Sequence, residues 1–180
     1  MAKLLLFQKS LLLLMLFSCV SSSPTKTVSK SYSEIYLSKL ETSKLTIKNI
    51  DINTYIVVSD EEQIHGLSSI KPEFFKNTDS MLFYNINDEV RSFWMPDTYF
   101  NLDIFFLDQN LKVLNVERNV PHHPGHSETP PIYRTGQYSC RHVFEMKHSE
   151  VSKKILIGDQ LLWKNPKDHS RIESSARLQK

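Results

Sequence analysis

The chain has few residues of the kinds that mark several classes of protein. Its 180 residues include only 4 glycines and 2 cysteines, and 22 basic side chains nearly balance 20 acidic ones. The shortage of glycine excludes collagen-like repeats and argues against glycine-rich nucleotide-binding loops. The balance of charge and the lack of a basic stripe interleaved with aromatic residues predict no nucleic-acid partner. Hydrophobic residues at 40% and charged residues at 23% are typical of one globular domain.

The N-terminus carries an apolar run that is too short to span a membrane. Lys3 and Lys9 are followed by the apolar residues 11–17, and residues 1–18 contain no acidic side chain. A membrane-spanning helix needs about 20 apolar residues, whereas a basic start before a short apolar run is typical of a signal peptide. We therefore predict a signal peptide over residues 1–18.

The end of this run, Leu16-Phe17-Ser18-Cys19, resembles the bacterial lipobox, in which the peptide is cut before a cysteine that is then acylated. Two or more acyl chains hold a protein stably on a membrane. The sequence thus predicts a lipoprotein that is exported and anchored to the bacterial cell envelope through lipid on Cys19. Val20 favours the outer membrane where two membranes are present. The alternative is an ordinary secretory signal that is cleaved within residues 21–23.

Three segments follow the predicted cleavage site. Residues 19–43 begin with small polar side chains and are predicted to be the lipidated cysteine and a flexible tether. Residues 44–163 are predicted to form a single β-rich domain. Residues 164–180 are polar and carry more basic than acidic side chains, so we expect a mobile or partly helical basic tail.

Hydrophobic and polar side chains alternate over short segments between residues 44 and 163, which is the period of a β-strand. About eight strands are predicted, at 45–48, 52–58, 80–84, 90–94, 102–108, 111–116, 141–146 and 160–163. No crossover helix of the usual length is visible, which disfavours a parallel α/β fold. The predicted fold class is mainly β (α+β), as a compact β-sandwich or barrel-like domain with one or two short helices.

Two short helices are predicted between the strands. Ser59 and Glu62 have the spacing of a capping box and Gly66 is a suitable stop, which together predict a helix near residues 60–65. Ser149 is a suitable cap for a second short helix that extends through residue 156.

Several blocks occur in a fixed order along the chain. They are Gly66-Leu67, Met81-Leu82-Phe83, Phe93-Trp94-Met95-Pro96-Asp97-Thr98, Leu102-Asp103-Ile104-Phe105-Phe106-Leu107-Asp108, Val143-Phe144-Glu145-Met146 and Gly158-Asp159. In this order they resemble the bacterial and archaeal domain-of-unknown-function family 192, over about residues 52–162. The resemblance implies a small, mostly β fold, and it agrees with export. It implies no activity, because a fold does not determine a function.

The chain departs from the pattern of that family at two places. The Gly-Leu-Met-x-Arg stretch of the family is Gly66-Leu67-Ser68-Ser69-Ile70 here, and Ser80 stands where the family has a glycine before Met81. No role of the family's methionine or arginine is therefore carried over to this chain.

A candidate pocket is predicted around the most specific of these blocks. Trp94 would form an apolar wall, with Thr98 and Asp103 as polar groups that fix a ligand. In the structural alternative, tryptophan and methionine fill the core, the threonine caps the turn and Asp103 accepts backbone N–H groups. Glu145 is expected on the strand face opposite Phe144, paired with a basic side chain of a neighbouring strand. The candidate pocket residues are Trp94, Met95, Asp97, Thr98, Asp103 and Glu145.

Imidazole and thiol side chains give weaker candidates for a metal site, namely His122, His123, His126, Cys140 and His142. Cys140 and His142 lie two residues apart on a predicted strand, so we expect them on one face, directed toward the core. Structural zinc sites show two tightly spaced ligand pairs, whereas only one such pair is visible here. No cofactor is predicted. Cys140 has no intramolecular disulfide partner once Cys19 is acylated, and a small buried hydrophobic role is expected for it.

The sequence therefore favours a lipid-anchored envelope protein whose domain binds a small ligand or an envelope protein without catalysing a reaction. No Gly-x-Ser-x-Gly motif, phosphate-binding loop or Cys-x-x-Cys pair is present. The alternative is an envelope hydrolase or a metal-handling protein that uses the loop of His122, His123 and His126 or the region of Asp103.

Overall fold

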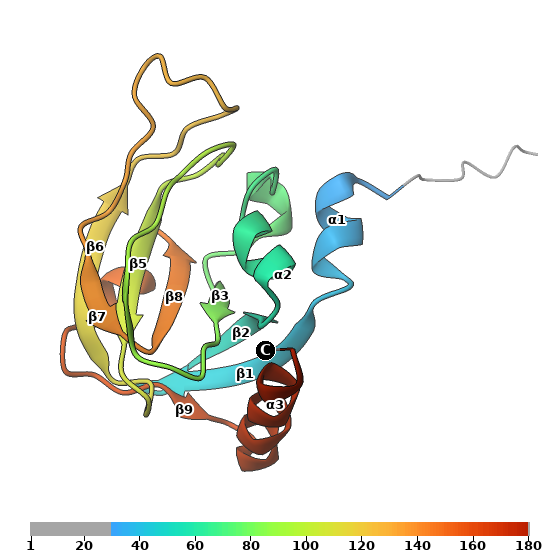
Figure 1. The fold of residues 1–180 in the computed structure, drawn as a ribbon, viewed down its shortest axis with the longest axis vertical. Coiled ribbons are helices and arrows are strands. Elements are labelled where there is room, and N and C mark those ends of the chain that lie inside the picture. Colours follow the sequence, from blue (N-terminus) through green and yellow to red (C-terminus); the bar gives the residue numbers. More distant parts are fainter. Residues whose placement is uncertain (1–29, 180) are drawn as a thin grey trace, which may run out of the picture.

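The computed structural model describes residues 30–179. Within these residues, seven strands form one sheet in the order β6-β5-β8-β3-β2-β1-β9, and β4 pairs with β7 in a second, small sheet. The large sheet curls into a half-barrel, with short helices around it (Figure 1). The predicted class, a compact and mainly β domain of the α+β type, is confirmed.

Short helices separate several of the strands. In chain order the elements are α1 (Tyr32–Leu37), β1 (Glu41–Ile47), β2 (Ile50–Val57), α2 (Asp60–His65), η1 (Pro72–Phe74), β3 (Asp79–Phe83), β4 (Glu89–Arg91), β5 (Leu102–Leu107), β6 (Val113–Val120), β7 (Tyr138–Cys140), β8 (His142–Lys147), η2 (Ser152–Lys154), β9 (Leu162–Trp163) and α3 (Pro166–Leu178). The helix predicted from Ser149 through residue 156 is reduced to the single 3₁₀ turn η2.

The β2 and β3 strands run parallel, whereas the other neighbouring strands of the large sheet run antiparallel. A parallel pair needs a crossover, and α2 and η1 supply it. The capping box that predicts α2 is present: the hydroxyl of Ser59 accepts the N–H of Glu62 at 3.2 Å, and the carboxylate of Glu62 accepts the N–H of Ser59 at 3.1 Å. Gly66 ends the helix with a φ of 50°, and a Cβ there would lie 3.2 Å from the ring of Phe83. The crossover therefore places α2 closely against β3.

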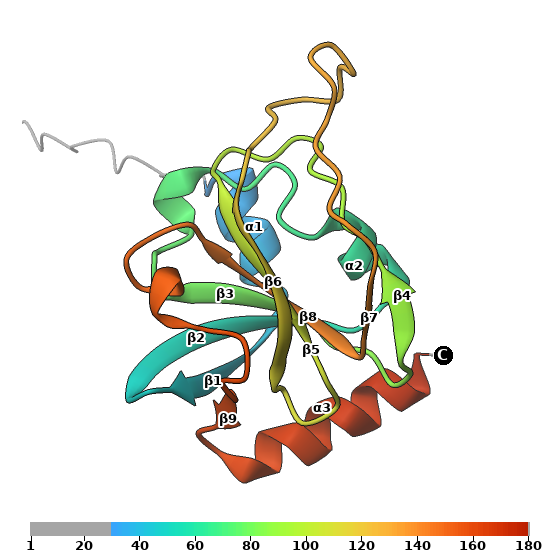
Figure 2. The same cartoon turned by 90° about the vertical axis from the view of Figure 1, so that its left-hand side faces the viewer.

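Side chains of the central strands alternate between two cores, one on each face of the large sheet. Phe83, Phe106 and Val143 belong to the first cluster, and Phe105 and Phe144 belong to the second. The α1 helix contributes Leu37 to the first cluster, and α3 contributes Ile172 and Ala176 to the second. Figure 2 shows α3 lying across one end of the sheet, away from α1 and α2.

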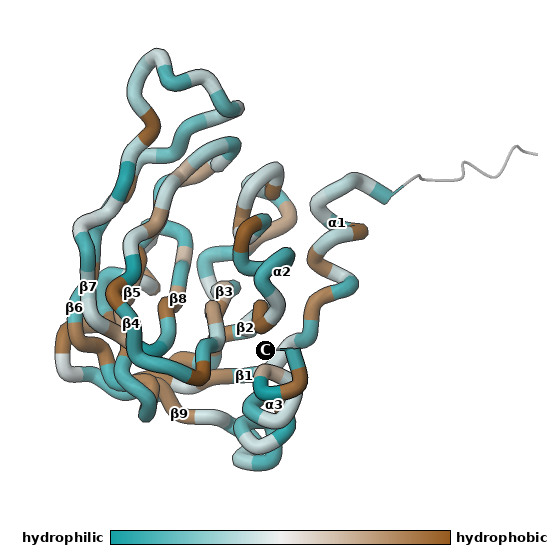
Figure 3. Tube along the Cα trace, viewed as in Figure 1, coloured by the Kyte–Doolittle hydropathy of each residue, from teal (hydrophilic) through white to brown (hydrophobic). Residues whose placement is uncertain are grey.

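The ordered domain extends beyond both boundaries that the sequence predicts. The α1 helix and the start of β1 occupy part of the segment 19–43, and Leu37 and Leu40 are buried in the first core. A helix of six residues is too short to show a helical period. The segment 164–180 contains α3, which begins at the cap residue Asn165. It is largely hydrophilic (Figure 3) and buries only Ile172 and Ala176, so its sequence resembles a solvated tail.

The predicted signal peptide and Cys19 lie outside the described residues. Among residues 30–179, no helix combines the length and the hydropathy that a bilayer-spanning segment needs.

Candidate binding pocket

An open pocket with a volume of about 1030 Å³ lies over the first core. One wall comes from α2 and the turn after it, and the opposite wall comes from residues 90–98. The buried side chains of Phe83, Leu102 and Glu145 form the floor. About half of the lining residues are apolar or aromatic, and the combination of such residues with a few polar groups is typical of small-molecule sites.

The pocket brings together residues that the sequence separates by about fifty positions. Of the predicted pocket residues, Trp94, Met95, Asp97, Thr98 and Glu145 line it. Trp94 and Met95 differ in their surroundings, because the indole is 44% exposed whereas Met95 is 2% exposed. Met95 therefore fills the core, and Trp94 forms an outer wall with the guanidinium of Arg134 4.5 Å from its ring centre.

Asp97 joins three segments of the chain at this wall. It has a φ of 51°, a left-handed conformation that Asp tolerates better than most residues. Its carboxylate accepts hydrogen bonds from the hydroxyls of Ser69 and Tyr99 and from the N–H of Gly125. Burial acts to raise the pKa of Asp97, but these hydrogen bonds outweigh it and hold the pKa below its usual range. Asp97 is therefore an ionised acceptor that fixes the wall.

Thr98 fixes the turn and the long loop after β6. Its hydroxyl donates to the carbonyl of Met95 at 3.0 Å and accepts the N–H of His123 at 2.9 Å. This loop, residues 121–137, projects beyond the end of the sheet (Figures 1 and 2). The contacts of Thr98 thus attach the base of the loop to the pocket wall.

Glu145 is the most unusual group in the pocket. Its side chain is 3% exposed, and it lies on the face of β8 opposite Phe144, as predicted. The expected basic partner is not found, because Met81 of β3 and Ile104 of β5 occupy the positions opposite it. Burial raises the pKa of Glu145 to about 8. The pocket floor therefore holds a carboxylic acid that is mostly protonated at pH 7.

Two further polar groups line the pocket. Arg91 bonds the carbonyl of Asn87 at 3.2 Å and lies 3.3 Å from the carboxylate of Glu89, and its buried Nε has no hydrogen-bond partner among the described residues. His65 lies 2.6 Å from the hydroxyl of Tyr32, so α1 and α2 are joined at the rim of the pocket.

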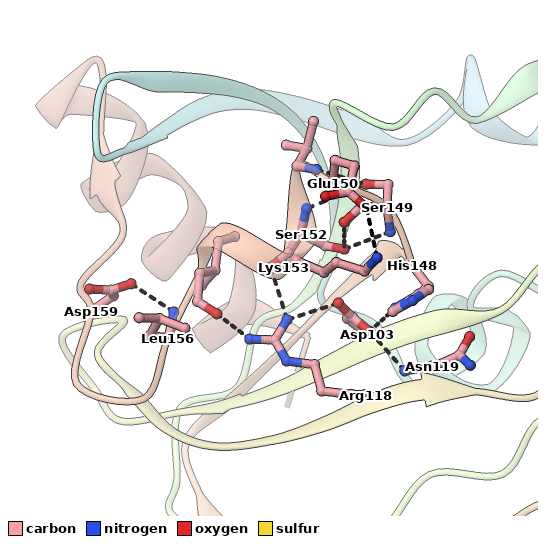
Figure 4. Close-up of polar contacts among 12 residues, drawn as sticks. Asp103, Arg118, Asn119, His148, Ser149, Glu150, Ser152, Lys153, Leu156 and Asp159 are labelled. Atoms are coloured by element: carbon pink, nitrogen blue, oxygen red, sulfur yellow. Dashed lines mark hydrogen bonds and ion pairs between the residues drawn. The ribbon is translucent and has the colours of Figure 1, made fainter.

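Asp103 lies away from the pocket, although its neighbour Leu102 lines it. Successive side chains of a strand point to opposite faces, and Asp103 is fully buried on the other face of β5. Its carboxylate binds the guanidinium of Arg118, the imidazole of His148 and the N–H of Asn119, each at 2.8 Å (Figure 4). Burial acts to raise the pKa of Asp103, but these bonds outweigh it and lower the pKa below its usual range.

The Asp103 cluster joins separate parts of the fold. Arg118 also donates to the backbone carbonyls of Ser152 and Ile155. The cluster therefore holds β5, β6 and the chain around η2 together (Figure 4). This arrangement agrees with the structural alternative for Asp103, in which its carboxylate accepts backbone N–H groups, because the N–H of Asn119 is one of its donors.

The histidines predicted as metal candidates lie in separate settings. His122 contacts the side-chain oxygen of Asn101 at 2.6 Å, His123 contacts the carbonyl of Ser127 at 2.7 Å, and His126 lies on the pocket rim. In the described part of the chain, no group of three or more His, Cys, Asp or Glu side chains is placed to hold a metal ion.

The expectation that Cys140 and His142 share one face is wrong. The chain passes from the small sheet to the large sheet at Arg141. Cys140 therefore ends β7 and belongs to the first core. His142 begins β8, and the centre of its ring lies 4.4 Å from the ring centre of Tyr84, which belongs to the second core. Burial raises the pKa of the Cys140 thiol and lowers the pKa of His142 to about 3. Cys140 is a buried thiol, as expected, and His142 is a neutral core side chain.

The sequence interpretation does not find the wall built by α2 or the position of Arg91. The helix itself is predicted, but its place against β3 follows from the parallel pairing of β2 and β3, which no local pattern reveals. Gly66 is the available signal, because a glycine after a short helix permits a close approach to a neighbouring element.

Comparisons with known proteins agree with this architecture. The family model of domain-of-unknown-function family 192, described as "Uncharacterized ACR", matches residues 43–163. A crystal structure from Sinorhizobium meliloti 1021, named as a candidate transcription regulator, is 21% identical with a TM-score of 0.55, over 69% of this chain and 95% of that one. A protein of unknown function from Novosphingobium aromaticivorans DSM 12444 is 19% identical with a TM-score of 0.53, over 69% and 85% of the two chains. These structures share the fold, and no curated protein matches the chain. The match over most of the chain shows that this protein belongs to domain-of-unknown-function family 192.

Proposed function

We propose that the protein is a lipid-anchored envelope protein whose domain binds a small ligand in this pocket without transforming it. The observation that carries the proposal is the carboxyl group of Glu145, which lies on the floor of the pocket and forms no hydrogen bond with another described residue. Among the described residues, the buried side-chain atom without a hydrogen-bond partner is Nε of Arg91, so the oxygens of Glu145 are accessible from the open pocket. A ligand in the pocket can therefore bond directly to this carboxyl group.

The hydroxyl groups of the lining favour binding over catalysis. Ser68 donates to the carbonyl of Pro96 at 3.1 Å, and Thr98 donates to the carbonyl of Met95. Ser69 donates to Asp97, whose lowered pKa makes it a weak base. A nucleophilic hydroxyl needs a base that can accept its proton, so these groups serve as supports of the wall.

Native mass spectrometry of the protein purified from its own envelope tests ligand binding. We expect a stoichiometric added mass on the wild-type protein, beyond that of the acyl chains. Trp94→Ala removes an outer wall and should lose the added mass. Ile157→Ala, which truncates an exposed apolar residue outside the pocket lining, should keep it. A bare mass for all three proteins would overturn the proposal of a bound ligand.

Fractionation of cells tests the proposed anchor. The support for it is the short apolar run of residues 11–17 followed by Cys19. Cys19→Ser removes the thiol that would be acylated, so the variant should move from the membrane fraction to the soluble fraction. A Cys19→Ser protein that sediments with membranes as the wild type does would refute the anchor.

A further inference from the structure

We infer that the ligand of this pocket carries a protonated amine on an apolar or aromatic body, and that the amine pairs with Glu145. The inference rests on the proposed binding function and names the chemical class of the ligand.

The neighbours of Glu145 in the sheet offer it no hydrogen-bond donor. It lies in the middle of β8, between Met81 of β3 and Ile104 of β5. Both neighbours are fully buried and apolar, so neither strand offers a donor. Phe83 and Leu102 flank this position on the pocket floor. A hydrogen-bond partner for the carboxyl group must therefore come from the pocket itself.

Other charged or titratable groups also line the pocket. Asp97 is bonded to Ser69, Tyr99 and Gly125. Arg91 is bonded to Asn87 and paired with Glu89 through its terminal nitrogen, whereas its buried Nε has no partner among the described residues. His65 contacts Tyr32, whereas Asp60 and His126 lie exposed on the rim. None of these groups forms a hydrogen bond or ion pair with Glu145, and burial is the sole cause of its raised pKa. Glu145 is therefore the acid of this pocket that is available to a ligand.

A carboxyl group such as Glu145 interacts differently with each class of ligand. An anionic group could accept a hydrogen bond from the protonated form of Glu145, but it would repel the ionised form and would face the negative faces of the aromatic rings in the lining. A neutral hydroxyl or amide would form an ordinary hydrogen bond. An amine cation forms a charge-assisted hydrogen bond, which is about twice as strong as a neutral one. It also neutralises the carboxylate inside an apolar site, where an unpaired charge is unfavourable.

The aromatic residues of the lining favour the same class of ligand. Phe83, Phe93 and Trp94 all line the pocket, and the face of an aromatic ring attracts a cation. The ring of Trp94 already has the guanidinium of Arg134 4.5 Å from its centre. The apolar walls would contact the body of the ligand, and Glu145 would fix its charged end.

Binding of this kind moves one proton. The protonated carboxyl group of Glu145 loses its proton to solvent, the carboxylate that forms pairs with the ammonium group, and no other bond is made or broken. Because burial raises the pKa of Glu145 to about 8, few molecules carry the carboxylate at pH 6. Raising the pH from 6 to 8 should therefore tighten the binding of an amine about 50-fold.

Isothermal titration calorimetry with the full chain in a non-ionic detergent tests the inference. The probes are 2-phenylethylamine and 2-phenylethanol, which share one apolar skeleton and differ in the amine. We expect the amine to bind the wild-type protein at least about tenfold more tightly than the alcohol at pH 8. Titrations in two buffers of different protonation enthalpy should show release of close to one proton at pH 6.5.

Matched variants assign the effect to one carboxyl group. Glu145→Gln keeps the size of the side chain and removes its charge, so it should lose the preference for the amine and the release of a proton. Glu61→Gln makes the same substitution at an exposed residue of α2 that does not line the pocket, and it should keep both. The proton release is measured on the wild-type protein, so it decides the question even where a variant folds poorly.

Three results would overturn the inference: equal binding of the two probes to the wild-type protein, unchanged amine binding by Glu145→Gln, or no binding of the amine. Equal binding that Trp94→Ala weakens for both probes would keep the pocket as a ligand site and reject the amine. If neither probe binds, the amine class is rejected, and the native mass measurement described above decides separately whether another ligand occupies the pocket.

Discussion

Glu145→Gln should make the folded protein more resistant to alkaline conditions. The pKa of Glu145 is about 8 in the fold and 4.5 in the absence of burial. An acid whose pKa is raised by folding contributes its full stability below the lower value, and that stability is lost as the pH rises through the higher value. Glutamine has nearly the same shape and does not ionise, so the variant lacks this loss.

The size of the effect follows from the two pKa values. Each pH unit between them is worth about 1.4 kcal/mol per proton at 25 °C. Ionisation of Glu145 therefore removes up to about 5 kcal/mol of the free energy of unfolding by the time the pH exceeds 8. Between pH 5 and pH 9, the stability of the variant relative to the wild type should rise by about 4 kcal/mol. This is a large share of the total stability of an ordinary domain.

Urea denaturation at five pH values between 5 and 9, followed by tryptophan fluorescence, measures this difference. Asp60→Asn is the control, because it changes a carboxylate to an amide on the exposed rim, and its stability relative to the wild type should stay constant. A difference between Glu145→Gln and the wild type that does not change with pH would refute the reasoning. It would mean that Glu145 is already ionised at pH 5 and is stabilised by a group that these contacts do not include.

Three further changes test the packing of the domain. Asp103→Asn should lower the free energy of unfolding by about 2–4 kcal/mol, because it weakens the pairing of a buried carboxylate with Arg118. The wild-type protein should also lose stability more steeply than this variant as the pH falls through the lowered pKa of Asp103, and parallel acid titrations would contradict that role. Ile172→Ala should cost about 2–4 kcal/mol in urea denaturation, and an unchanged midpoint would mean that α3 does not pack on the second core. The Cys140 thiol should react with a chromogenic disulfide only after unfolding, whereas rapid labelling of the folded protein would contradict its burial.

The parts of the fold that could be predicted are those that short patterns determine. The capping box of Ser59 and Glu62 depends on residues three apart, and it locates α2. The β2 strand is visible from its alternation of apolar and polar residues, and β5 is visible as a short, mostly apolar run. By contrast, α3 has only two buried residues, Ile172 and Ala176, and its hydrophilic surface hides the stripe that packs on the sheet.

The residues of the pocket also differ in whether a short sequence pattern brings them together. Trp94, Met95, Asp97 and Thr98 lie within five consecutive residues, so one turn brings them together. Glu145 joins them only through the pairing of β8 with β3 and β5, and its lack of a basic partner depends on which residues those strands place opposite it. Alternation along β5 separates Asp103 from Leu102, because neighbouring residues on a strand point to opposite faces.

The contacts of Asp97 also bear on the motions of this domain. One carboxylate binds the turn after α2, its own turn and the long loop at Gly125, so these three segments share a single set of hydrogen bonds. Segments that share their stabilising contacts open together as one cooperative unit, with a lower free energy than that of global unfolding. Amide hydrogen exchange in residues 67–70, 94–99 and 123–126 should therefore rise in concert when Asp97 is replaced. The wall of the pocket and the projecting loop would then open in one local event, which would change the shape of the pocket.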